Sequence, residues 1–395
     1  MLNKKMFELG NTRSVIRDLF EYGKQLKETI GEDKVFDFTL GNPSVPCPNE
    51  VNEYASKLIL TEPNVHGYTS ANGDLATRKA IASYNKTKYG FSLDENLIYM
   101  TCGAAAALRI VLSSIISEPD EEILAIAPFF PEYKVFTESS GGVFKFVPCD
   151  ETYFSVDFKE LEKAVTPKTR GIIINSPNNP AGTVYSEETI KTISDILNKK
   201  QKEYGYPIYI IADEPYREIL FDGATCPFIP KYYDNTIICY SYSKALSLPG
   251  ERIGYVAVSP KCENAKNLYI TVMGAGRALG YVCAPSLFQK VLAIHADKIS
   301  NADPYKDNRD ILIKTLSSLN FKCVNPQGAF YLFIKSPIPD AVEFSNSAKK
   351  YGLLLVPSNS FGVNGYLRLA TCVDRKTAVN SKDAFTLLAK EYNLI

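Results

Sequence analysis

Three short polar segments and one arginine follow apolar runs of the sequence, and they hold the side chains best suited to chemistry. Asn179, Asp213 with Tyr216, and Lys244 lie at the ends of three successive apolar runs, and Arg252 comes shortly after. Taken alone, a lysine after a strand is usually solvated, an aspartate there usually caps a helix, and an arginine near a turn is usually a surface charge. Their joint occurrence at the ends of apolar runs is more specific and predicts a site.

These residue types meet the needs of pyridoxal 5′-phosphate (PLP). A lysine amine, here Lys244, holds the cofactor's aldehyde as a Schiff base when burial and cationic neighbours keep it partly deprotonated. A carboxylate, here Asp213, keeps the pyridine nitrogen protonated, so that the ring withdraws electrons from the substrate carbanion. Asn179 and Tyr216 can donate to the ring's phenolic oxygen.

A phosphate group needs a fixed guanidinium and a cluster of backbone N–H groups. Arg252 offers the first. The turn Gly103-Ala104-Ala105, which opens an alanine-rich segment, offers the second through the amides and the dipole of a helix N-terminus.

Apolar runs without polar alternation predict the elements that position these residues. Such runs occupy 96–100, 122–127, 171–174, 207–212, 236–240 and 253–258. They are typical of strands buried on both faces of a mostly parallel sheet, in which ligands bind at the carboxyl ends of the strands. Helical spacing predicts helices over 13–30 and 104–116, and 35–40 reads as extended.

The sequence pattern changes after about residue 285. From there, predicted helices alternate with short apolar runs at 330–334, 353–356 and 366–369, which we expect to be strands. We therefore expect an α/β protein with a large domain (46–285) built on a mostly parallel, seven-stranded type of sheet covered by helices. A smaller α+β domain would comprise 1–45 and 286–395.

Composition narrows the classes of protein. The 395 residues carry 44 basic and 44 acidic side chains without a polybasic run, which argues against a nucleic-acid or membrane partner. The nine cysteines form no CxxC pair, and the two histidines are His66 and His295, so neither a disulfide framework nor a metal site is expected. No apolar stretch fits a signal peptide, and we expect a cytoplasmic protein.

The motifs Asn-Pro-x-Gly, Asp-x-x-Tyr and Ser-x-x-Lys, followed by Arg252, resemble those of the fold-type I aminotransferases of class I/II, the group that contains aspartate aminotransferase. The resemblance covers nearly the whole chain in the family's order. It includes Gly41, the segments 66–69, 128–133 and 328–331, and Arg368.

The resemblance implies a role for each matching residue. Lys244 would be the Schiff-base lysine and proton shuttle, with Asp213 on the ring nitrogen and Asn179 and Tyr216 on the phenolic oxygen. The phosphate would be held by Gly103, Ala104, Ala105, Ser241, Arg252 and, from the neighbouring subunit of a homodimer with shared sites, Tyr68. Phe130 would stack on the pyridine ring, and Arg368 would bind the substrate α-carboxylate with Asn179 and Gly41.

The implied activity is ping-pong transamination between amino acids and 2-oxo acids, with an aspartate-aminotransferase-like or broad specificity. Two departures leave the side-chain pocket open. Ala105 stands where some bacterial aspartate aminotransferases have lysine, and Arg277 is the nearest candidate for a second-carboxylate arginine, although it also fits a surface charge. Aromatic residues such as Phe130 and Tyr133 would instead favour aromatic or apolar amino acids.

Other functions share parts of this pattern. A C–S lyase, a decarboxylase or an aminocyclopropane-carboxylate synthase would carry the same lysine, aspartate, tyrosine and arginine. A non-catalytic regulatory protein on the same fold is a further alternative. Gly274, Gly276 and Gly280 resemble a weakened dinucleotide fingerprint, but the motif lies late in the chain and Pro285 would end its helix early.

Overall fold

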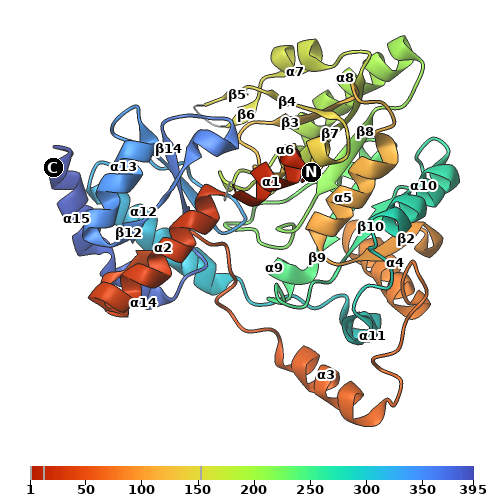
Figure 1. The fold of residues 1–395 in the computed structure, drawn as a ribbon, viewed down its shortest axis with the longest axis horizontal. Coiled ribbons are helices and arrows are strands. Elements are labelled where there is room, and N and C mark those ends of the chain that lie inside the picture. The colour runs from red at the N-terminus through yellow and green to blue at the C-terminus, as the bar shows by residue number, and fades with distance from the viewer. Residues whose placement is uncertain (1, 12–13, 152–153) are drawn as a thin grey trace.

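A seven-stranded sheet forms the centre of the protein in the computed structural model, which describes residues 2–11, 14–151 and 154–395 (Figure 1). The strand order is β2-β10-β9-β8-β7-β3-β4, and only β10 runs against its neighbours. The predicted α/β class with a mostly parallel sheet is confirmed. The strands are β2 (Ile98–Thr101), β3 (Glu122–Ile126), β4 (Val143–Val147), β7 (Thr169–Asn175), β8 (Tyr209–Asp213), β9 (Thr236–Ser241) and β10 (Gly254–Val258).

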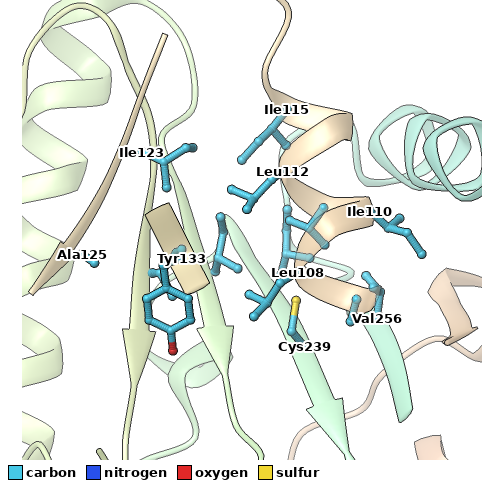
Figure 2. Close-up of a cluster of buried hydrophobic side chains, with 14 of the residues drawn as sticks. Leu108, Ile110, Leu112, Ile115, Ile123, Ala125, Tyr133, Cys239 and Val256 are labelled. Atoms are coloured by element: carbon cyan, nitrogen blue, oxygen red, sulfur yellow. The ribbon is translucent and has the colours of Figure 1, made fainter. Parts of the chain in front are cut away.

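Alternate strand residues point to opposite sides of the sheet. Because these side chains are apolar on both sides, helices cover both faces. Ile173 and Ile211 belong to the cluster that α5 and α10 cover, whereas Ile172 and Ile210 pack in the cluster under α8. In Figure 2, Leu108, Leu112 and Ile115 of α5 face side chains of the sheet. The helices of this region are α3 (Asn49–Thr61), α4 (Leu75–Tyr89), α5 (Ala104–Ile115), α6 (Glu132–Ser139), α7 (Phe158–Ala164), α8 (Glu187–Tyr204), α9 (Tyr242–Ala245), α10 (Ala265–Ala278) and α11 (Ser286–His295).

A second group of elements surrounds a three-stranded sheet of order β11-β14-β13, beside the parallel pair β1 and β12. Its core is a separate apolar cluster that includes Phe344, Leu367 and Phe385. Among the described residues, no helix combines the length and the apolar character needed to cross a membrane. The elements of this group are α2 (Val15–Ile30), β1 (Phe36–Asp37), α12 (Asp303–Ser318), β11 (Tyr331–Lys335), α13 (Ala341–Ala348), β12 (Leu353–Leu354), β13 (Val356–Pro357), β14 (Tyr366–Ala370), α14 (Arg375–Asn380) and α15 (Lys382–Glu391). The N-terminal helix α1 (Lys4–Asn11) and the small hairpin of β5 (Cys149–Asp150) and β6 (Ser155–Val156) lie instead at the large sheet, where Lys5 Nζ of α1 donates to the Glu138 carbonyl of α6 (Figure 1).

Two local expectations differ from the structure. The extended segment 35–40 pairs as a strand only over β1, because β12 offers two partner residues. The edge strand β4 was not predicted, since its sequence Val-Phe-Lys-Phe-Val exposes most residues and is not a uniformly apolar run. The expected domain boundaries at 45/46 and 285/286 stay a prediction. Within the segment 1–45, α2 contacts β13 of the smaller sheet, whereas Lys5 of α1 bonds to Glu138 of α6.

Candidate active site

The predicted polar residues converge at one edge of the large sheet. Because β7, β8 and β9 are parallel and in register, Asn175 lies beside Asp213, and Asp213 lies beside Cys239. The antiparallel β10 starts at this same edge, where Gly254 pairs with both Ser241 and Thr101. The chain therefore brings the end of β2, the end of β9 and the segment before β10 together.

Asp213 lies buried at the end of β8, with an exposed fraction of 5%. Its Oδ2 accepts a hydrogen bond of 2.5 Å from the Tyr133 hydroxyl, and Asn175 Nδ2 donates to its backbone carbonyl. Oδ1 has no hydrogen-bond partner among the described residues. Burial raises the pKa of this carboxyl group to about 7, although the Tyr133 bond lowers it. Asp213 is therefore a buried acceptor that lacks a cationic partner.

Lys244 lies on the short helix α9, which begins after β9 and is capped by the Ser241 hydroxyl. Its Nζ donates to the carbonyl oxygen of Gly41 at 2.5 Å, so two segments far apart in sequence meet here. Burial, with a smaller contribution from the positive charges of Arg252 and Arg368, lowers the pKa of the amine to about 8. A substantial fraction of the amine is thus neutral near pH 8, which is the nucleophilic form.

A cradle for an anion forms where α5 begins. Gly103 precedes the first turn of α5 with a φ of +83°, a conformation that favours glycine. A Cβ at this position would lie 3.0 Å from a terminal nitrogen of Arg252, so the absent side chain leaves room for the guanidinium. Arg252 is held by the Pro249 carbonyl at 2.9 Å. Free helix amides and a guanidinium together suit a phosphate group.

Arg368 of β14 is the most completely buried cation predicted for the site, with an exposed fraction of 2%. One terminal nitrogen donates to Asn179 Oδ1 at 3.0 Å and the other to the Thr39 carbonyl at 2.5 Å. Its Nε has no partner among the described residues. The guanidinium lies over the Tyr331 ring at 4.5 Å. A buried cation with only neutral acceptors is suited to bind a carboxylate.

Tyr216 and Phe130 lie among aromatic side chains. The Tyr216 hydroxyl is 3.1 Å from the Tyr331 hydroxyl, and its ring meets Phe330 edge to face. Phe130 is perpendicular to the Tyr133 ring at a centroid distance of 5.7 Å. Among the other predicted residues, the Ser241 hydroxyl lies 2.8 Å from that of Ser243.

Four predicted residues show no such contact in the single chain. Tyr68 has an exposed fraction of 97%. Ala104 and Ala105 form the first turn of α5, and Ala105 is exposed. Arg277 is exposed in the last turn of α10. Their predicted roles stay predictions.

The sequence patterns assign no site role to Asn175 or Tyr331 and predict Tyr133 only in a substrate pocket. The Asn175 side chain holds both the Asp213 carbonyl and the Asn179 N–H. The signal for Tyr133 and Tyr331 was their place inside the matched segments 128–133 and 328–331, but the sequence could not show what their hydroxyls bind.

Comparisons with known proteins identify the family. The profile of the family described as "Aminotransferase class I and II" matches residues 33–380. The chain belongs to this family.

Similar proteins agree with the assignment. The chain is 31% identical to a "Probable aspartate aminotransferase" of Methanocaldococcus jannaschii, over 90% of this chain and 92% of the relative. It is 27% identical to an "Aromatic-amino-acid aminotransferase 2" of Thermococcus litoralis, over 97% of each chain. A crystal structure of an amino transferase from Eubacterium rectale aligns with a TM-score of 0.97 at 49% identity, over 100% of this chain and 99% of that one. The enzyme class is therefore amino-group transfer, EC 2.6.1.

The family depends on PLP, and the residues present fit that cofactor. The unpaired Oδ1 of Asp213 is an acceptor for a protonated ring nitrogen. The first turn of α5 and the guanidinium of Arg252, which lies against Gly103, are suited to hold the cofactor's phosphate. Lys244 supplies an amine with a lowered pKa. The ring nitrogen, the phosphate and the aldehyde of the cofactor would thus each have a suitable partner at this edge of the sheet.

Proposed function

We propose that this enzyme is a PLP-dependent amino-acid:2-oxo-acid aminotransferase that works by ping-pong transamination on aspartate and glutamate, with broad specificity. The observation that carries the proposal is the buried Asp213. Its carboxylate has one free oxygen, and no lysine or arginine among the described residues contributes to its pKa. A cation from outside the chain satisfies it, and a protonated pyridine nitrogen is such a cation.

PLP supplies an electron sink for the negative charge that develops at the substrate Cα. The chain's residues supply binding and proton transfer. Arg368 binds the α-carboxylate through a planar guanidinium that Asn179 and Thr39 hold in place. Gly103 and Arg252 hold the phosphate, and Asn179 and Tyr216 donate to the phenolic oxygen. The neutral amine of Lys244 moves the proton from the substrate Cα.

A symmetric homodimer is part of the proposal. Tyr68 is a large side chain that is 97% exposed in the single chain. Tyr68 and Arg277 would act in the site of the neighbouring subunit, where Tyr68 would bind phosphate and Arg277 the second carboxylate of the substrate.

A screen of half-reactions tests the activity. Mixing the purified PLP-loaded enzyme with one amino acid and no 2-oxo acid should change the visible absorbance of the cofactor with aspartate and glutamate, and should release one 2-oxo acid per site. Addition of 2-oxoglutarate should restore the spectrum, because the two half-reactions are separate. Release of pyruvate with ammonia, or of carbon dioxide, would instead show a lyase or a decarboxylase.

Substitution of Arg277 decides between dicarboxylic and aromatic substrates. If its guanidinium binds the second carboxylate, Arg277→Ala should weaken kcat/KM for aspartate by about 10- to 100-fold, the value of a charge-assisted hydrogen bond. Turnover of phenylalanine should change little. Lys266→Ala is the matched control, since Lys266 is an exposed cation on the same helix α10. If both variants have the same kinetics with aspartate, Arg277 does not bind the substrate, and the aromatic alternative is favoured.

A further inference from the structure

Tyr133 contacts the carboxylate that the proposed chemistry depends on. Its hydroxyl donates to Asp213 Oδ2 at 2.5 Å, and the exposed fraction of its side chain is 1%. In Figure 2 the hydroxyl points away from the labelled apolar side chains of α5, while the ring lies beside them. The ring therefore belongs to the core, and the hydroxyl belongs to the site.

Neighbouring contacts leave Asp213 little freedom. Asn175 Nδ2 fixes its backbone carbonyl at 2.9 Å, and Tyr133 fixes Oδ2. Oδ1 is then the carboxylate oxygen without a partner among the described residues. Tyr133 lies in the first turn of α6, three residues after Phe130, whose ring is perpendicular to its own. One short segment thus carries both the proposed stacking ring and the bond to the carboxylate.

We propose that Tyr133 is a positioning residue that binds Oδ2 of Asp213, keeps the carboxylate ionised in its buried position and turns Oδ1 toward the pyridine nitrogen of the cofactor. The inference rests on the proposed function. It adds a residue that acts through Asp213 and touches neither substrate nor cofactor.

The electrostatic surroundings explain why such a donor is needed. The titratable groups that face the Asp213 carboxylate are Tyr133, Tyr216 and Cys239, and burial raises the pKa of each of them. All three are neutral at physiological pH, so they offer no positive charge. Burial alone drives the pKa of Asp213 upward, and the Tyr133 bond is the opposing contribution. Loss of this bond should leave more of the carboxyl group protonated at neutral pH.

The first test measures the titration of Asp213 in the cofactor-free protein. The infrared band of the protonated carboxyl group, taken as the difference from Asp213→Asn, gives its pKa directly. Tyr133→Phe keeps the buried ring and removes only the hydroxyl. The pKa of Asp213 should rise by about one unit or more, since a hydrogen bond to a charged group has this size. An unchanged titration would overturn the proposal.

The second test uses the PLP-loaded enzyme. Tyr133→Phe should lower kcat about 10- to 100-fold while the KM for the amino acid changes less than about threefold, because the substrate still meets Arg368. Tyr233→Phe is the matched control. Tyr233 is also 1% exposed, and its hydroxyl donates to the Ile208 carbonyl at 2.6 Å, in the cluster on the other face of the sheet. Both variants should lose stability, but the control should keep the kcat and the Asp213 titration of the wild type.

A measurement on the wild type keeps the inference falsifiable if Tyr133→Phe does not fold. A hydroxyl proton shared over 2.5 Å with a carboxylate gives a far-downfield proton resonance. We expect this resonance above the pKa of Asp213 and its loss in Asp213→Asn. Its absence from the wild type would overturn the inference. The outcome is separable from the proposed function, since failure of amino-acid half-reactions with an intact Tyr133–Asp213 bond would refute the function alone.

Discussion

Replacement of Lys244 by alanine should abolish transamination, with kcat reduced by at least about a thousandfold, as is typical when a group that acts in covalent catalysis is removed. The Lys244 amine donates a hydrogen bond to the Gly41 carbonyl in the site, and no other lysine among the described residues donates to that carbonyl. The cofactor should still bind through the phosphate cradle and Asp213, because those contacts do not involve the lysine.

Lys244→Arg is the sharper control for this prediction. Arginine keeps a cation at the position, but its guanidinium stays protonated and is no nucleophile. The two variants should therefore be equally inactive. The wild type offers a further measurement. Its rate of Schiff-base formation with added PLP should rise as the pH increases through about 8, because the amine loses its proton there. Substantial turnover in Lys244→Ala, measured with the cofactor bound, would refute the assignment.

Asp213→Asn should be the second most damaging change to activity. The amide cannot offer a negative charge to the ring nitrogen, so kcat should fall by about 100- to 1,000-fold, the cost of removing one preorganised electrostatic contact. Asp213→Glu should be milder. The control is Glu122→Gln, which removes another buried acid at the opposite end of a parallel strand, where Lys145 is its partner. That variant should keep its kcat, and equal losses in both would exclude a specific role for Asp213.

The same Asp213→Asn substitution should stabilise the cofactor-free protein at pH 8. In the unfolded chain the carboxyl group ionises near 3.8, whereas in the folded chain it holds its proton up to about 7. The folded state binds more protons between these values, so stability falls as the pH rises through them. The cost reaches about 4 kcal/mol at most above pH 7. Denaturation curves of the wild type and of Asp213→Asn at pH 8 and below pH 4 check this. The stability advantage of Asp213→Asn at pH 8 should be lost in acid, where the carboxyl group of the wild type is protonated in both states. A variant less stable than the wild type at pH 8 would contradict it.

The fold class is predictable from the sequence because the strands are buried on both faces. Largely β-branched runs such as 171–174 and 236–240 show no polar alternation, so they indicate a covered, mostly parallel sheet. The carboxyl ends of parallel strands meet at one edge of a sheet, so the sequence predicts that Asp213 and Lys244 lie near each other. The edge strand β4 carries no such signal, because its exposed residues follow the pattern of a surface.

The sequence by itself determined the residue types of the site, their order along the chain and the sheet edge where they gather. The tertiary structure decided what each polar atom meets. Only the fold brings Gly41 to Lys244, Thr39 to Arg368 and Tyr133 to Asp213. These contacts join residues far apart in the sequence, and they set burial and hydrogen bonding. Burial and hydrogen bonding in turn set the pKa values of the amine and the carboxyl group, and no local pattern encodes them.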